Sequence, residues 1–166
     1  MTRNRLVIIL NVIVSILFII PTFKLDLLNE NYSTLSLTTR GYLYVLFLGI
    51  FIGSLLSYET YLISKNKTRS VIMFSSLLVG TIIPHHVPYN LQGNLHLLFA
   101  YIGFAGITIS TIINIKTTKY HNIYLLFLIL AVTLYLKYGM VNTLSEVIVM
   151  LSSLYFNLIT SIKKED

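Results

Sequence analysis

The sequence predicts an all-α integral membrane protein, a polytopic bundle of about six transmembrane helices with both chain ends in the cytoplasm. Of the 166 residues, 55% are hydrophobic and 11% are charged, whereas a soluble domain carries about 25% charged residues. The apolar residues occur in long blocks, as in membrane spans, and not in periodic stripes. Lys and Arg occur in small groups at the ends of these blocks, which is the pattern that sets membrane topology.

The apolar blocks predict a single transmembrane domain over residues 1–166, with spans at about 6–23, 42–63, 71–84, 95–115, 123–136 and 141–162. A helix needs about 20 apolar residues to cross the hydrocarbon core, with a lower limit near 17. The third and fifth blocks are therefore short, and a count of four or five spans stays open if the third block is re-entrant. The first block is followed by no small-x-small cleavage site, so we interpret it as a retained span.

The basic residues predict the orientation of these spans. With the N-terminus inside, nine Lys and Arg residues are cytoplasmic and three are external (Lys24, Arg40 and Lys137), a bias that favours cytoplasmic termini and a multi-pass protein of the cell membrane. The net charge of +6 then indicates anionic lipid headgroups as partners and not nucleic acid.

Cysteine is absent, which excludes disulfides and thiolate chemistry. The abundance of Ile, Asn, Lys and Tyr is typical of an AT-rich bacterial genome.

The connection between the third and fourth blocks holds most of the imidazoles. The stretch "IIPHHVPYNLQGNLHLLFA" (82–100) contains three of the four histidines and two of the three prolines, and the orientation places it at the outer face. One interpretation is structural: the prolines interrupt helical hydrogen bonding, and Asn90, Gln92 and Asn94 supply partners for the released backbone groups. The other is functional, with the amides binding an ester carbonyl or a phosphate.

Two carboxylates lie within the apolar blocks. Glu146 is five residues into the sixth block, roughly 8 Å below its outer boundary, where it must face the bundle, be paired or be protonated. Its role is either a structural hydrogen bond or that of an acid/base or metal-ligand carboxylate. Glu59 lies near the cytoplasmic end of the second block, where we expect it to be more exposed than Glu146, with Lys65 or Arg69 near it.

Six spans bring the imidazoles and one carboxylate to the same side of the membrane. His85, His86, His96 and Glu146 are all expected at the outer face, where they would form a catalytic acid/base set or the ligand set of a zinc site. Their spacing is unspecific, because no His-Glu-x-x-His motif occurs.

Small residues at Gly49–Gly53 and Gly103–Gly106 favour close helix packing.

The stretch "GTIIPHHVPYNLQGNLHLLFAYIGF" (80–104) resembles small six-span membrane proteins of the DRAM/Sfk-like kind. Such proteins place a proline-containing turn before a His that begins the next span, with a small residue about one turn later, and the corresponding positions here are Pro84, His96 and Ala100. The chain is also similar, in size class and expected span count only, to the membrane component of the bacterial lipoprotein N-acylation system.

These observations favour a membrane-embedded lipid-acting enzyme, which would transfer or hydrolyse an acyl group of a phospholipid or lipoprotein at the outer leaflet. His96 would then be an acid/base or ligand, His85 or His86 its companion, and Glu146 the orienting carboxylate. Two alternatives stay open. One is a non-catalytic membrane subunit, immunity protein or assembly factor with a second membrane protein as its partner. The other is a small transporter with Glu146 as its proton or cation site.

Overall fold

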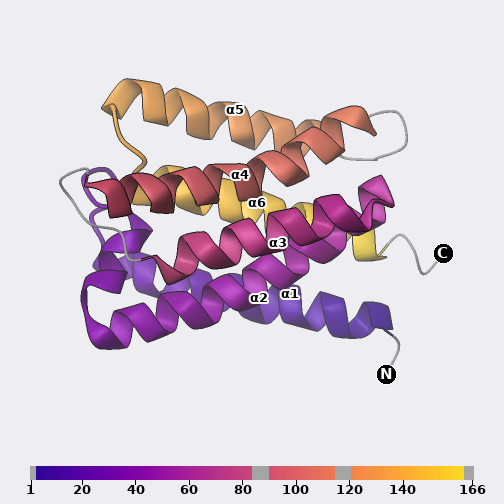
Figure 1. Cartoon of the computed structure of the whole chain (residues 1–166), viewed down its shortest axis with the longest axis horizontal. Helices are drawn as coiled ribbons and strands as arrows, with labels where there is room; N and C mark the ends of the chain where they lie inside the picture. The colour runs from indigo at the N-terminus through magenta and orange to yellow at the C-terminus, as the bar shows by residue number, and fades with distance from the viewer. Residues whose placement is uncertain (1–2, 84–89, 115–120, 163–166) are drawn as a thin grey trace. The chain divides into compact units, whose positions relative to one another are not determined.

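The computed structural model describes residues 3–83, 90–114 and 121–162 (Figure 1). The predicted all-helical fold is confirmed for these residues, among which no strand occurs. The α-helices are α1 (Arg3–Ile19), α2 (Thr39–Ser64), α3 (Lys67–Ile82), α4 (Leu91–Ile113), α5 (His121–Tyr138) and α6 (Thr143–Ile162), and the 3-10 helices are η1 (Ile20–Lys24) and η2 (Tyr32–Leu37).

Polar caps fix where several helices begin. The side chains of Thr38, Asn66 and Asn90 accept hydrogen bonds from backbone N–H groups three residues further on, at the starts of α2, α3 and α4. Each bond satisfies a donor that has no partner inside its helix. The cap at Asn66 also explains why α3 begins before the apolar block predicted from residue 71, because its first turn is polar.

Among the described residues, four helical segments are long and apolar enough to cross a membrane: Arg5–Lys24, Thr39–Ser64, Leu91–Ile113 and His121–Tyr138. The apolar part of α6, Thr143–Ile159, is shorter. Large apolar side chains are exposed on these segments, among them Leu6, Leu43 and Leu126. The described residues are therefore compatible with a multi-pass membrane protein, while the count of six spans and the cytoplasmic termini stay predictions.

The chain forms two compact units, and residues 33–118 make up one of them. In this unit α2, α3 and α4 pack against one another in all three pairings (Figure 1). The predicted small-residue contacts are confirmed: a Cβ at Gly49 would meet Thr81, and one at Gly103 would meet Leu77, both on α3. The buried apolar residues of the unit are Leu48, Ile52, Leu55, Leu56, Met73, Leu77 and Ile107.

The other unit is built from the two ends of the chain, residues 1–32 and 119–166. Within it, α6 packs against both α1 and α5. Two aromatic stacks hold its core: Phe18 with Tyr32, whose ring centroids are 4.3 Å apart, and Tyr124 with Phe156, at 5.6 Å. The start of α6 is fixed by reciprocal bonds between Asn142 and Ser145, which work as a capping box does.

Candidate functional site

His96 lies in the second turn of α4, where that helix passes the C-terminal end of α3. Gly80 permits the approach, because a Cβ at this position would lie 3.2 Å from the backbone nitrogen of Ala100 and 3.4 Å from the carbonyl oxygen of His96. Ala100 is the small residue expected one turn after His96, and its backbone packs on Gly80. The two helix backbones are therefore close enough for the half-buried imidazole to reach the end of α3.

The ring nitrogen Nδ1 of His96 lies 2.7 Å from the carbonyl oxygen of Gly80 and 2.8 Å from that of Ile83. A carbonyl oxygen can only accept a hydrogen bond, so Nδ1 must carry the proton and donate it to both oxygens. In the neutral imidazole the other nitrogen, Nε2, is then an acceptor with an available lone pair. The end of α3 thus selects the tautomer of His96.

The Nε2 lone pair of His96 is directed at a hydroxyl group. Ser33 Oγ lies 3.1 Å from Nε2, and with neutral His96 the serine is the donor. Ser33 is the second residue of η2, and its own carbonyl oxygen accepts a bond from Ser36 Oγ at 2.6 Å. Both Ser33 and His96 are half-buried.

The arrangement of Ser33, His96 and the two carbonyls matches the geometry of an activated nucleophile. Such sites place a hydroxyl within about 2.6–3.2 Å of a base whose other side is oriented by a third group. Here Ser33 Oγ is the hydroxyl, His96 Nε2 the base, and the carbonyl oxygens of Gly80 and Ile83 the orienting groups. The described residues can therefore remove a proton from Ser33, or from a water that replaces its hydroxyl.

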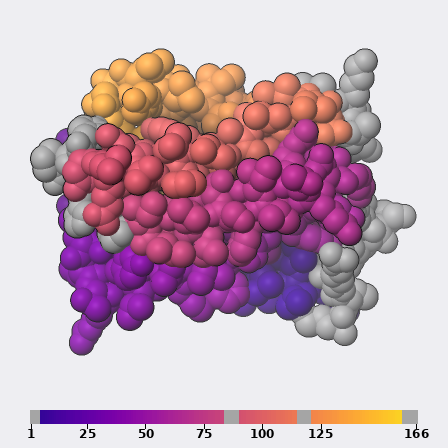
Figure 2. All heavy atoms as spheres, in the orientation of Figure 1, coloured from indigo at the N-terminus to yellow at the C-terminus, as the bar shows by residue number. Residues whose placement is uncertain are grey.

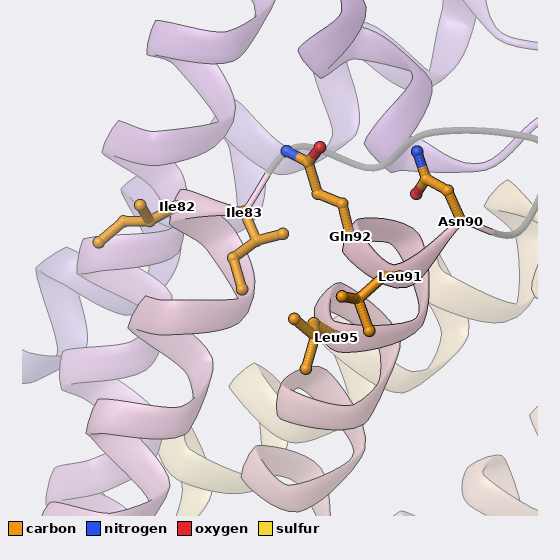
Figure 3. Close-up of a pocket in the computed structure, with 6 residues that line it drawn as sticks. All are labelled: Ile82, Ile83, Asn90, Leu91, Gln92 and Leu95. Carbon is orange, nitrogen blue, oxygen red and sulfur yellow. The ribbon is translucent and has the colours of Figure 1, made fainter.

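An apolar cavity lies beside this pair, between the end of α3 and the start of α4 (Figure 3). Its volume is about 520 Å³, and it is lined by Ile82, Ile83, Asn90, Leu91, Gln92 and Leu95. Ile83 belongs both to the cavity wall and to the carbonyl pair that holds His96. Ligand pockets commonly combine such a hydrophobic lining with a few polar groups.

The structure brings two of the three predicted substrate-binding amides to this cavity. Asn90 and Gln92 line it, and Figure 3 shows both amide groups near the helix ends, with Leu95 deeper between the helices. Asn90 Oδ1 caps α4 by accepting from the backbone N–H of Gly93 at 2.8 Å, so the NH₂ group is the part of its amide that can meet a ligand. Asn94 is exposed and is not among the lining residues.

Glu146 lies in the unit formed by the chain ends and has a backbone partner. Its Oε2 accepts a hydrogen bond from the backbone N–H of Tyr32. Beside it, the backbone N–H and the hydroxyl of Thr143 both donate to the carbonyl oxygen of Glu30, at 2.7 and 2.9 Å. Glu146 therefore helps to bind the segment before η2 to the start of α6. The predicted convergence of Glu146 with His96 stays a prediction.

Glu59 is more buried than the sequence suggested. Its side chain is 0% exposed, whereas Glu146 is only half-buried, so the expected order of exposure was wrong. The reason is the packing of α2 on α3 at this level, where Thr60 Oγ1 lies 2.8 Å from Met73 Sδ and Ser57 bonds Ser70. Proximity to the end of an apolar block did not imply exposure to the membrane surface.

The predicted metal site cannot be assembled from the described residues alone. His85 and His86 lie outside them, and no group of three His, Asp or Glu side chains suited to a metal ion occurs in the ranges that the structure covers. The zinc site at His85, His86, His96 and Glu146 accordingly stays a prediction.

Ser33 is the residue of this site that the sequence analysis missed. Serines within the apolar blocks are not available in the same way: the hydroxyls of Ser152 and Ser153 both donate to the carbonyl oxygen of Val149 in their own helix. The predicted topology could have pointed to Ser33, because it places the segment 24–40, which contains Ser33, and the start of α4 at the same face of the membrane. Ser33 has no local motif that marks it.

Comparisons with protein-family models, with curated proteins and with solved structures found no match for this chain. The class of protein is therefore defined here by the fold and the site alone. The part of the chain that the structure describes is all-helical, with four helices long and apolar enough to span a membrane. It carries an oriented serine–histidine pair beside an apolar cavity.

Proposed function

We propose that the protein is a membrane-embedded enzyme that hydrolyses or transfers an acyl group of a phospholipid or lipoprotein at the outer leaflet. The observation that carries the proposal is the contact between Ser33 Oγ and His96 Nε2 at 3.1 Å, with Nδ1 held as a donor by two carbonyl oxygens. The six predicted spans with cytoplasmic termini would place this pair at the outer surface.

In the proposed reaction Ser33 Oγ attacks the acyl carbonyl carbon while its proton moves to His96 Nε2. The carbonyl oxygens of Gly80 and Ile83 stabilise the resulting imidazolium through Nδ1–H. Collapse of the tetrahedral intermediate breaks the ester bond, and His96 returns the proton to the leaving alcohol. Water or an amine then attacks the acyl-serine and gives its proton to His96. Collapse of this second intermediate breaks the bond between the acyl carbon and Ser33 Oγ, and His96 returns the proton to Ser33.

The cavity beside the pair suits a substrate with both a chain and a headgroup. Ile82, Ile83, Leu91 and Leu95 offer apolar contact for an acyl chain, and the amide N–H groups of Asn90 and Gln92 can donate to an ester carbonyl or a phosphate. A site at the boundary between membrane and water lets each part of a lipid stay in its preferred surroundings.

Covalent labelling tests this function directly. The full chain in detergent should react with a fluorophosphonate probe, and the adduct should map to Ser33. Ser33→Ala should remove the adduct, and His96→Gln, which can still donate to a carbonyl but cannot act as a base, should slow labelling by about 10²–10⁴-fold. Ser54→Ala is the control, because Ser54 Oγ only donates to Ile50 in its own helix. A wild-type chain that takes up no probe would refute the serine mechanism.

The zinc prediction is the metal-dependent form of the same hypothesis, with His85, His86, His96 and Glu146 as ligands. Because Nδ1 of His96 is bonded to carbonyls, zinc would have to take Nε2 and displace Ser33. Chelator treatment separates the two forms: serine labelling should be unchanged under the serine mechanism and should increase if zinc occupied Nε2. Metal analysis of the purified protein provides the independent measurement.

One observation favours a non-catalytic subunit or assembly factor as the second candidate. The bonds from His96 to Gly80 and Ile83 also satisfy carbonyl groups at the end of α3, which is a structural role. Under this alternative the His96→Gln chain would remain in the membrane and keep its biological activity. Complementation of a deletion strain by His96→Gln and by Ser33→Ala distinguishes a subunit from an enzyme.

A further inference from the structure

A second cavity lies at the other end of α3, in the groove between α3 and α4. Its volume is about 260 Å³, and it is lined by Asn66, Thr68, Arg69, Ile72, Met73, Ile102 and Gly106. Arg69 and Ile83 are fourteen positions apart along α3, which corresponds to roughly 21 Å at 1.5 Å per residue. The second cavity is therefore distinct from the site of Ser33 and His96.

One end of the cavity is polar and positively charged. Arg69 is half-buried, and its Nη1 lies 3.5 Å from Ser110 Oγ, whose own hydroxyl donates to the carbonyl oxygen of Gly106 at 2.7 Å. A guanidinium has five N–H donors in a planar fork that matches the oxygens of a phosphate. The contact to Ser110 uses one of these donors at most, and Thr68 adds an exposed hydroxyl beside it.

The other end of the cavity is apolar and open to the surroundings. Ile72 and Ile102 are 54% and 39% exposed, whereas Met73 is 0% exposed and forms the floor. Gly106 leaves the space above this floor, since a Cβ there would lie 3.1 Å from Met73 Cβ. Figure 2 shows α3 and α4 side by side on the face towards the viewer.

The charges around the cavity favour an anion. Lys65 caps the end of α2, and Lys67 and Arg69 lie in the first turn of α3. Glu59 is the single acidic residue in the sequence between positions 33 and 118. Glu59 is fully buried, so its carboxylate does not contribute to the exposed surface. A molecule that approaches this end of α3 therefore meets cationic side chains.

We infer that this cavity binds one anionic phospholipid of the membrane leaflet at the N-terminal end of α3. The phosphate lies against the Arg69 guanidinium and the Thr68 hydroxyl, and an acyl chain follows Ile72 and Ile102 over Gly106. The small volume accommodates the phosphate and the upper part of one chain, and the remainder of the lipid stays in the bilayer. This site is separate from the proposed enzyme function and does not depend on it.

Lipid binding to the purified full chain tests the inference. Native mass spectrometry would measure binding of phosphatidylglycerol and of phosphatidylcholine with the same acyl chains. We expect wild-type protein to prefer phosphatidylglycerol, and Arg69→Gln to raise its Kd about tenfold, the scale of one lost charge-assisted hydrogen bond. Arg69→Lys keeps the charge and should retain the preference, which shows that the altered helix start still folds.

Lys65→Asn is the matched control for charge. It also removes one cation, and asparagine tolerates the left-handed backbone of this residue, whose φ is 55°. Lys65 does not line the cavity, so the Kd of this variant should stay within about twofold of wild type, as expected of a screened surface charge. Equal losses in Lys65→Asn and Arg69→Gln, or equal binding of the two lipids by wild type, would overturn the inference.

Discussion

At the scale of single residues, the imidazole of His96 has two roles: one nitrogen bonds the end of α3, and the other contacts Ser33. Its Nδ1–H holds the carbonyl oxygens of Gly80 and Ile83, and its Nε2 faces Ser33. The first set of bonds fixes the orientation that the second requires. A substitution at this position therefore changes stability as well as any activity, and the two effects must be measured apart.

His96→Ala should lower the free energy of unfolding by about 1–3 kcal/mol, because it removes the donor for two carbonyl oxygens at the end of α3. His96→Gln should cost less, since its amide can still donate to one of them. Unfolding of the detergent-solubilised chain by a denaturing detergent measures the difference. Gln92→Ala, at an exposed position of the same helix, is the control and should be close to neutral.

Asp26 offers a pH-dependent prediction outside the membrane-spanning helices. The side-chain amide of Asn29 and the backbone N–H groups of Leu28 and Asn29 bond its carboxylate and lower the pKa of Asp26. The ionised form therefore stabilises this turn above the ordinary pKa of aspartate, and the stabilisation is lost as pH falls through the lowered value.

Asn29→Ala removes the largest cause of this shift, so the pKa of Asp26 should rise toward its ordinary value. A carboxyl carbon titration by NMR measures the midpoint in both chains. An unchanged midpoint in Asn29→Ala would contradict the assigned cause.

At the scale of elements, the corner between η2 and α2 depends on a glycine. A Cβ at Gly41 would lie 1.9 Å from the carbonyl oxygen of Leu35, and this oxygen belongs to the backbone and cannot turn away as a side chain could. The corner is therefore closed to any larger residue, and the position of Ser33 in η2 depends on it.

Gly41→Ala should destabilise the protein by at least about 3 kcal/mol, the upper end of the usual cost of overpacking. It should also reduce fluorophosphonate labelling of Ser33. Gly139→Ala is the contrasting variant: its φ is +70° and no atom lies within 4 Å of the added Cβ. Only backbone strain of about 1–2 kcal/mol opposes that change. Equal losses in the two variants would show that crowding at Leu35 is not the cause.

The sequence predicted the helices well and the side-chain contacts less well. Apolar runs identify buried or lipid-facing helices directly, so the block at 42–63 lies within α2. The polar first turn of α3 could not be recognised from apolarity, because its start depends on the Asn66 cap. Ser33 and His96 are 63 residues apart, and a contact over this separation leaves no local pattern. The burial of Glu59 likewise depends on neighbouring helices.

At the scale of the whole molecule, the membrane topology remains a prediction, and the composition of the chain allows a direct test by cysteine labelling. It contains no cysteine, so one introduced thiol gives one labelling site. Lys24→Cys, Lys67→Cys and Lys137→Cys replace exposed lysines at the ends of three different helices, η1, α3 and α5. Six spans with cytoplasmic termini require a membrane-impermeant maleimide to label positions 24 and 137 in intact cells, and position 67 only after permeabilisation. Labelling of position 67 in intact cells would refute this arrangement.

The division of the chain into two units affects how it is synthesised. Residues 33–118 are continuous, so α2, α3 and α4 can pack together as soon as α4 has left the ribosome. In contrast, α1 precedes the whole of this unit in the chain, and its packing partner α6 follows it. With the predicted spans, α1 would therefore enter the membrane well before α6 and remain without this partner until residues 143–162 have been synthesised.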